Sequence, residues 1–303
     1  MIEQLINEQI SSDPQIRGML TTYKGAPAFF YQKAPQDNDK GWTKPCYPRA
    51  DFNIDMRYDP ERKTSGTLSI NVWCTTECAT VGSDDPDKAV EKRLIELIGG
   101  TFYTGEESAT TCAVWNRSDA FSIEGTASTG QTTAPEVFGI AILFDLTEFP
   151  DQITTAPDPI QGANSWTKLH FPQMMVIAHD EMPPIWKPND TNPAIYWRFE
   201  GTASESRQSY AVTWYIGNFA AHVISESVTE RNKWTKALIE QIQLDGEIIL
   251  EDTSPMFIQQ IQIRHNADPL REGQLSLTGQ YGVLAQHRKE HAQEGLAPII
   301  QEK

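Results

Sequence analysis

The chain has 303 residues, of which 39% are hydrophobic and 22% charged, and its net charge is −16. This composition is typical of a folded protein and argues against extended disorder. Acidic residues outnumber basic ones 22 to 13 in residues 1–150 and 19 to 12 in the rest. That balance argues against a nucleic-acid-binding groove, which needs clustered Lys and Arg.

No apolar run approaches the ~20 residues that a membrane span requires, and no basic stretch followed by an apolar one opens the sequence. We therefore expect no membrane partner and synthesis in the cytosol. The length suits two domains better than one, because a single hydrophobic core rarely extends over so many residues.

The first half begins with helical spacing of apolar residues over 2–20, interrupted at Pro14. A short strand at 27–31 and a long polar loop at 34–48 follow. Alternating apolar and polar residues then predict a strand hairpin over 51–59 and 66–75. Because Phe52, Ile54, Met56 and Tyr58 share one side of the first strand, the sheet should have one buried and one wet face.

A helix is expected next, started by Ser83, Asp84 or Asp85 and ended by Gly99 and Gly100. Its acidic first turn suits the helix dipole. Four strands are expected after it, over 101–103, 111–115, 121–124 and 137–146.

The second half opens with a proline-rich stretch, 151–160, that reads as a linker. A strand is expected over 174–178, then a proline-rich loop over 182–193. Ser227 and Glu230 form a capping-box pattern for a helix that ends near Gly246. Strands follow over 247–250, 256–264 and 274–284, the middle one with a bulge because its alternation is only partial. Residues 286–303 read as a charged, exposed arm.

The two halves repeat one order of elements. Lys92–Ile98 returns as Lys236–Ile242 with five of seven residues identical, 144 positions later. Flanking strands recur in the same order. The sequence therefore predicts an α+β fold made of two tandem copies of a mainly antiparallel sheet packed against one or two helices. The predicted domains are 1–150 and 161–285, joined by the linker 151–160 and followed by the arm 286–303. The second copy is expected to lack a counterpart to the N-terminal helix of the first.

Motifs that carry chemistry are weak in this sequence. His287 and His291 have the spacing of two helical metal ligands, but Arg288 stands where a zinc protease has Glu. No glycine-rich phosphate loop and no nucleophile elbow is present. All six histidines lie at or beyond residue 170, so a histidine-dependent site would belong to the second domain, with His222 and His265 as candidates.

The four cysteines do not form a zinc-binding pattern, because Cys74 and Cys78 are separated by three residues and no second cluster follows. We expect them to be core thiols. No catalytic residue, cofactor-binding residue or metal ligand is therefore assigned, and we expect no enzyme activity.

The order of elements in residues 1–150 resembles the tail terminator, or tail completion, proteins of long-tailed bacteriophages and related phage-tail-like particles. The resemblance is carried by an N-terminal helix (1–6), a strand ending in a Lys-Ala-Pro loop (30–35) and a Pro-Arg-Ala-Asp-Phe strand (48–52). A polar hairpin, a Leu-Ser-Ile-Asn-Val-Trp strand and a Lys-Arg-Leu-Ile-Glu helix follow. The resemblance covers the first half best, and the second copy departs from the family, whose members are mostly single domains of about half this length.

The resemblance implies a structural virion protein, assembled in the host bacterial cytoplasm, that forms a ring at the head-proximal end of the tail tube. Such a ring stops tube polymerisation and joins the tail to the head connector or neck proteins. Six chains, or three chains that present six domains, would form it, and DNA would pass through the bore without specific binding. Two alternatives stay open: another neck, tube-initiating or baseplate component on the same scaffold, or a ligand-binding or hydrolytic module of phage origin.

For an assembly protein, long loops are the candidate contacts between subunits. The loop 34–48 offers Trp42, Lys44 and Tyr47, and the loop 182–193 offers Trp186 and Lys187. The alternative for both loops is that they cover their own domain.

Overall fold

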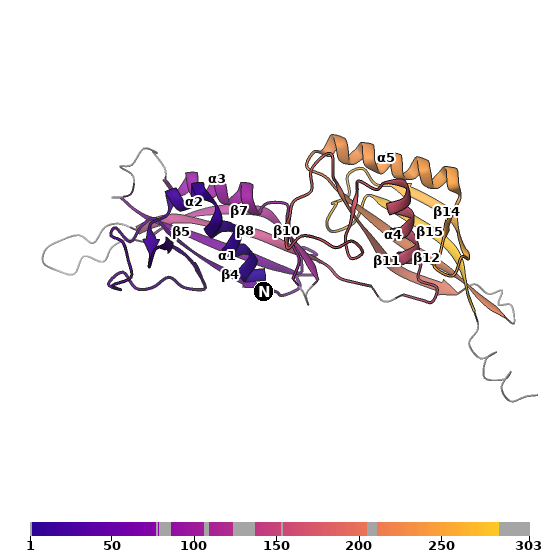
Figure 1. Ribbon diagram of the computed structural model, residues 1–303, viewed down its shortest axis with the longest axis horizontal. Coiled ribbons are helices and arrows are strands. Elements are labelled where there is room, and N and C mark those ends of the chain that lie inside the picture. The colour runs from indigo at the N-terminus through magenta and orange to yellow at the C-terminus, as the bar shows by residue number, and fades with distance from the viewer. Residues whose placement is uncertain are drawn as a thin grey trace, which may run out of the picture. The chain divides into compact units, whose positions relative to one another are not determined.

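The computed structural model describes residues 2–76, 78, 86–105, 109–123, 137–152, 154–204 and 211–284 (Figure 1). The chain divides into two compact units. Unit 1 comprises Met1–Pro150 and Glu181–Pro188, and unit 2 comprises Asp151–Asp180 and Asn189–Lys303. The predicted caps Ser83, Asp84 and Asp85 and the predicted arm 286–303, with His287 and His291, lie outside the described residues.

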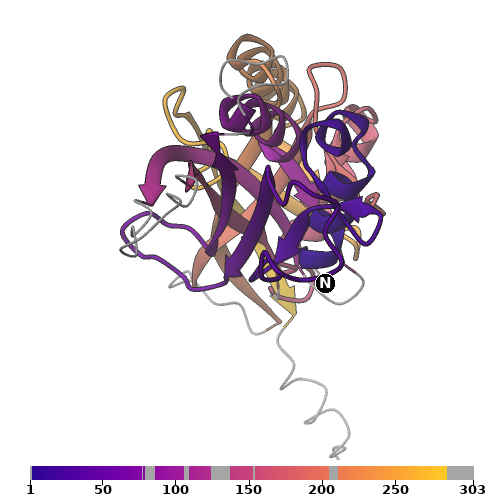
Figure 2. The same ribbon diagram turned by 90° about the vertical axis from the view of Figure 1, so that its left-hand side faces the viewer.

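Unit 1 is a seven-stranded sheet with three helices on one face (Figures 1 and 2). Its strand order is β10 (Ile185–Trp186), β6 (Thr101–Tyr103), β7 (Thr110–Ile123), β8 (Val137–Phe149), β5 (Gly66–Thr75), β4 (Arg49–Asp55) and β3 (Phe29–Tyr31). Only β3 and β4 pair in parallel; the other neighbours are antiparallel. A separate small ribbon pairs β1 (Thr22–Tyr23) with β2 (Ala26–Pro27).

The helices of unit 1 are α1 (Ile2–Ser12), α2 (Pro14–Met19) and α3 (Pro86–Ile98). Alternation along β5 points Leu68, Ile70 and Val72 at them, and all three are fully buried. The predicted break at Pro14 and the predicted helix end at Gly99 are confirmed. The strand β4 ends at Asp55, four residues before the predicted end at 59. Met56 and Tyr58, which were predicted to share the side of Phe52 and Ile54, therefore lie outside the strand and are 42% and 69% exposed.

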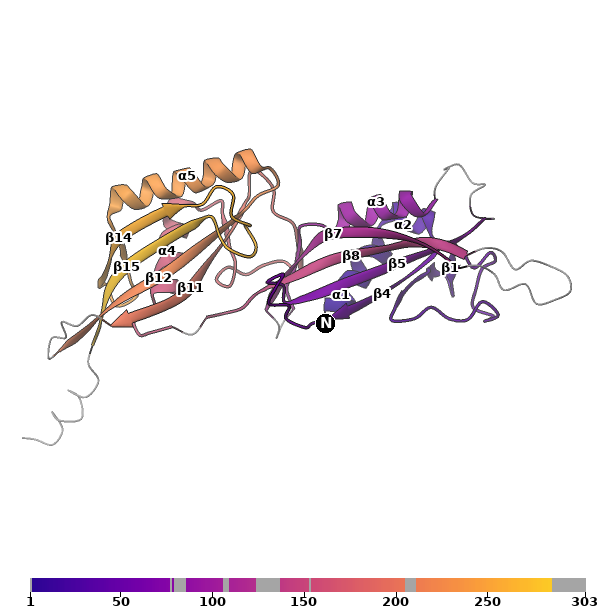
Figure 3. The ribbon, with the colours of Figure 1, turned by 180° about the vertical axis from the view of Figure 1, so that it is seen from behind.

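Unit 2 is a six-stranded sheet with two helices on one face (Figure 3). Its strand order is β13 (Glu247–Ile249), β14 (Pro255–Ile263), β15 (Leu275–Leu284), β12 (Val212–Ile224), β11 (Ala194–Ser204) and β9 (Met175–Val176). Its helices are α4 (Pro159–His170) and α5 (Val228–Asp245). The predicted bulge in β14 is confirmed between Ile258 and Gln260.

The two sheets share one strand order once β10 is set aside. From one edge to the other, the order in unit 1 is β6, β7, β8, β5, β4 and β3, and the matching order in unit 2 is β13, β14, β15, β12, β11 and β9. Each sheet has its parallel pair at the same place, β3 with β4 and β9 with β11. The helices α3 and α5 likewise follow the second long strand of each unit. The α+β fold class predicted from the sequence is confirmed.

Several predicted boundaries were wrong. The second unit does have an N-terminal helix, α4, which begins inside the predicted linker because Asp158 caps it with bonds from Ile160 N and Gln161 N. Residues 181–188 belong to unit 1 and not to the second domain. The strands expected at 111–115 and 121–124 are one strand, β7, with a bulge between Trp115 and Arg117. Among the described residues, no helix combines the length and apolarity that a membrane crossing requires.

Candidate assembly surfaces

The loop 34–48 is held against unit 1 by Trp42. Its indole Nε1 donates to the carbonyl of Gln36 at 2.9 Å, and its ring meets Tyr23 and Phe30 edge-on at 5.0 and 5.6 Å. The side chain is only 8% exposed. The indole therefore packs within its own unit, which favours the alternative that this part of the loop covers its own domain.

Tyr47 also turns inward, onto Arg49. The guanidinium of Arg49 lies 4.4 Å from the Tyr47 ring centre and 2.5 Å from Oδ1 of Asp37, while the Tyr47 hydroxyl donates to Oδ2 of Asp37 at 3.2 Å. Burial is the main cause that raises the pKa of Tyr47. Lys44 is exposed, so of the three residues predicted in this loop it is the one that reaches solvent.

The second predicted loop is also attached to its own chain. Within unit 1, β10 pairs with β6, and Trp186 packs against Phe102 with ring centres 6.0 Å apart. Lys187 Nζ donates to the carbonyl of Glu96 at the end of α3, at 3.0 Å. Trp186 and Lys187 therefore contact residues of their own unit and are not at the tip of a free loop. Ile and Trp both have high strand propensity, a signal that sequence reasoning missed when it predicted a loop over 182–193.

The face of the unit 1 sheet opposite the helices is seen in Figure 3, and the side chains that β4 and β5 place on it are mostly polar. Asp51 on β4 accepts from Asn71 Nδ2 at 2.9 Å and from Trp73 Nε1 at 2.6 Å. Asp55 and Asp119 also carry exposed carboxylates, each beside an arginine. In the described part of unit 1, no helix covers these groups.

Large apolar side chains are exposed at the β3–β4 side of unit 1. Tyr31 on the edge strand β3 is 41% exposed, and Met56 and Tyr58, just after β4, are 42% and 69% exposed. An edge strand presents unpaired backbone groups as well. Exposed apolar residues beside a sheet edge are typical of protein–protein contacts, although neither Tyr31 nor Tyr58 was predicted from the sequence to be a contact between subunits.

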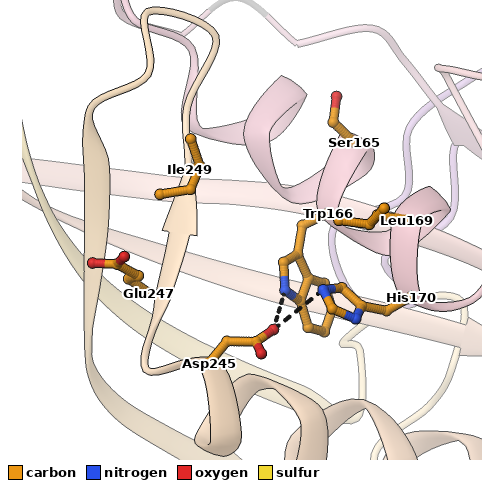
Figure 4. A pocket seen from close by; sticks show the side chains of 7 residues that line it. All are labelled: Ser165, Trp166, Leu169, His170, Asp245, Glu247 and Ile249. Carbon is orange, nitrogen blue, oxygen red and sulfur yellow. Dashed lines mark hydrogen bonds and ion pairs between the residues drawn. The ribbon is translucent and has the colours of Figure 1, made fainter.

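Unit 2 contains a pocket of about 410 Å³ between α4, the end of α5 and β13 (Figure 4). Asp245 Oδ2 accepts from Trp166 Nε1 at 2.7 Å and lies 3.3 Å from His170 Nε2. Leu169 and Ile249 form the apolar rim and are 76% and 51% exposed. Sequence reasoning missed this pocket because α4 was not expected.

The histidines named from the sequence do not meet. His222, on β12, is 1% exposed and its Nδ1 donates to the carbonyl of Pro269 at 2.9 Å. Burial, and then the charge of Arg198, lower its pKa to about 4. His265 lies exposed in the turn after β14. Neither histidine lines the pocket.

Of the cysteines, Cys74 and Cys112 are buried as expected, and burial raises the pKa of Cys74 to about 12. Cys46 and Cys78 are half-buried, so the prediction of core thiols holds for two of the four. Among the described residues, no three His, Cys, Asp or Glu side chains gather in a way that could hold a metal ion.

The fold defines an α+β protein of two units, each with one sheet face covered by helices. No family model matches the chain, and no curated protein matches it.

Proposed function

We propose that this chain is a structural protein of a phage tail or phage-tail-like particle. It assembles into a ring at the head-proximal end of the tail tube, ends tube polymerisation and joins the tail to the head connector. The observation that carries the proposal is the shared strand order of the two units. It supports a chain that presents two copies of one module, as the repeat between the two halves of the sequence suggested.

Duplication of an ancestral domain is the simplest origin of that order. The helices α3 and α5 support this origin. Leu94 and Leu238 occupy the same place in the repeated heptapeptide, and both are fully buried. The same holds for Ile98 and Ile242, whose exposed fractions are 0% and 1%. Three chains would then supply six modules, and six chains would supply twelve. Closed rings are the usual outcome for identical subunits with a directional contact.

Particle shape and mass test the assembly. Negative-stain electron microscopy should show closed rings, and native mass spectrometry should give three or six times the chain mass of 34.1 kDa. A monomer at micromolar concentration would contradict the proposal. Open filaments would also contradict it, because a terminator must close.

Activity on tubes tests the terminator role. Purified ring, added to polymerising tube protein of the same particle, should shorten the tubes and be found at one end of them. Tubes of unchanged length, with the ring bound to a baseplate protein instead, would favour the alternative of a tube-initiating or baseplate component.

The polar sheet face of unit 1 suits a bore through which DNA passes, because each exposed carboxylate on it offsets the arginine beside it and so opposes phosphate binding. The exposed carboxylates of Asp55 and Asp119 are the ones to test. Replacing both by Lys should slow DNA exit from assembled particles at low salt, and an unchanged exit rate would count against a bore at this face.

A further inference from the structure

The outer edge of the unit 1 sheet is covered by a segment from a distant part of the chain. Ile185 and Trp186 pair antiparallel with Tyr103 and Phe102 of β6. The amide of Thr104 donates to the carbonyl of Pro184 at 3.0 Å. Ile185 packs against the unit 1 core. The segment 184–186 thus satisfies backbone groups that an open edge would leave unpaired.

The corresponding strand of unit 2 is β13, and within the described residues no strand pairs with its outer edge. The carbonyl of Gly246 accepts from Ile258 N at 3.1 Å, and the amide of Leu250 donates to the carbonyl of Ser254 at 2.8 Å. These bonds point toward β14. Backbone groups of an antiparallel strand alternate in direction, so those of Glu247 and Ile249 face the outer edge. Gly162 of α4 lies beside the Ile249 carbonyl there, since a Cβ on Gly162 would be 3.4 Å from that oxygen.

The pocket of about 410 Å³ lies beside this edge, with α4 as its opposite wall (Figure 4). Glu247 and Ile249 of β13 line it from one side. Its rim is apolar: Leu169 and Ile249 are 76% and 51% exposed. An open edge next to an apolar pocket is the arrangement that takes an added strand, with the backbone pairing along the edge and a side chain in the pocket.

The C-terminal part of the sequence contains a segment of the same pattern as the one that covers β6. Residues 296–301, Leu-Ala-Pro-Ile-Ile-Gln, align without a gap with 182–187, Met-Pro-Pro-Ile-Trp-Lys. Both have Pro and Ile at the third and fourth places, a large apolar residue at the first and fifth, and a long polar residue at the sixth.

The segment is tethered close enough to reach β13 of its own chain. Glu247 pairs with Phe257 of β14, and Phe257 pairs with Gln280 of β15. Glu247 therefore lies two strand spacings, about 10 Å, from Gln280. Leu284 ends β15 four residues further along, about 13 Å. Residues 285–295 can span about 36 Å when extended. A short tether also raises the effective concentration of the segment at the edge.

We propose that residues 298–300 of the same chain add to the open edge of β13 as an antiparallel strand. Tyr103 and Ile248 are the residues of β6 and β13 that face the core of their units. With these two matched, the register of β10 on β6 places Ile299, the counterpart of Ile185, opposite Ile248, with its side chain in the pocket. Ile300 then lies opposite Glu247, and the amide of Ile249 donates to the carbonyl of Pro298.

Disulfide trapping tests this register. Glu247→Cys with Ile300→Cys, in a full-length chain that also carries Cys46→Ser and Cys78→Ser, should close an intramolecular disulfide, because Cα atoms of such a pair lie about 5.5 Å apart. The control is Glu247→Cys with Glu290→Cys, whose second cysteine lies in the shorter tether that precedes the segment and is able to reach Glu247 by chance collision. The first pair should form its disulfide at least about tenfold faster in oxidised glutathione, measured by mass spectrometry.

Equal rates for the two pairs would overturn the proposal, because they would reflect random collision of the tether. A disulfide found only between two chains would overturn it as well and would assign the edge to a second copy.

Amide hydrogen exchange provides an independent readout. In the full chain the amide of Ile249 should be protected, and removal of residues 296–303 should speed its exchange at least about tenfold while the amides of β15 keep theirs. Equal exchange of the Ile249 amide in both chains would contradict the added strand.

Discussion

Asp13 joins two helices with one carboxylate. Its Oδ1 accepts from the amides of Gln15 and Ile16 at 3.1 and 2.9 Å and so caps α2, while its Oδ2 lies 2.6 Å from Arg93 Nη2 on α3. Asp13→Ala should lower the free energy of unfolding of unit 1 by about 1–3 kcal/mol in urea titrations. Ser12→Ala, one residue away, is the matched control, and a loss no larger than that of the control would refute the role.

The same carboxylate predicts a pH dependence. The hydrogen bond from Arg93 is the main cause that lowers the pKa of Asp13. Its stabilising contribution is therefore complete above the unfolded-state pKa of about 3.9 and is lost as pH falls through the lower folded-state value. Asp13→Asn keeps an acceptor for the cap but removes the charge, so it should flatten the stability curve of unit 1 below about pH 4.

His222 predicts a pH dependence of unit 2 at milder pH. Burial, then the Arg198 charge, lower its pKa to about 4 against about 6.5 when unfolded, and the hydrogen bond to the Pro269 carbonyl, then Glu200 and Asp268, oppose the shift. The unfolded state therefore binds the proton first as pH falls. Unit 2 should lose up to about 3 kcal/mol between pH 6.5 and 4. His222→Gln should remove most of that slope in urea titrations at pH 7 and 5, and an unchanged slope would assign it to other groups.

At the scale of the elements, helix α5 begins and ends at the residues that its sequence predicts. Ser227 caps it by accepting from Glu230 N at 3.2 Å, as predicted, and Gly246 ends it at φ +70°. The reciprocal half of the capping box is absent, because the amide of Ser227 donates instead to Asp190 Oδ1 at 2.8 Å.

Two glycine substitutions should have opposite signs. Gly246→Ala places a Cβ at a left-handed position and should destabilise unit 2 by about 1 kcal/mol. Gly18→Ala, inside α2 with no atom within 4 Å of the added Cβ, should stabilise unit 1 by about 0.4–1 kcal/mol. Thermal unfolding of the two variants checks both, and the same sign for both would show that backbone conformation does not decide the effect.

At the scale of the whole molecule, the proposed ring needs a contact surface, and the β3 edge with Tyr31 is the one that we expect to serve. Tyr31→Lys should shift rings toward single chains in native mass spectrometry, because a charged side chain on an edge strand opposes strand pairing between subunits. Leu244→Lys is the matched control, since Leu244 is 79% exposed on α5. Rings that resist Tyr31→Lys but not Leu244→Lys would move the contact to unit 2.

The sequence by itself determined the local elements, because they follow from periodicity and caps. The alternation of apolar and polar residues predicted which face of β5 is buried. The repeated heptapeptide predicted the buried stripes of α3 and α5. It missed α4 because the buried side of that helix includes Ala163, Asn164 and Thr167 rather than a row of large apolar residues. Periodicity reads hydrophobic side chains only.

Only the tertiary structure decided where the two predicted contact loops go. Trp42 and Trp186 look alike in sequence, each in a proline-rich loop, yet one fills its own loop and the other enters the edge of the unit 1 sheet as β10. Pairing between segments about 80 residues apart depends on which edge is open and on what packs beside it. The spacing of neighbouring residues reveals neither the open edge nor the side chains beside it. The sequence could therefore identify these two tryptophans but could not assign their partners.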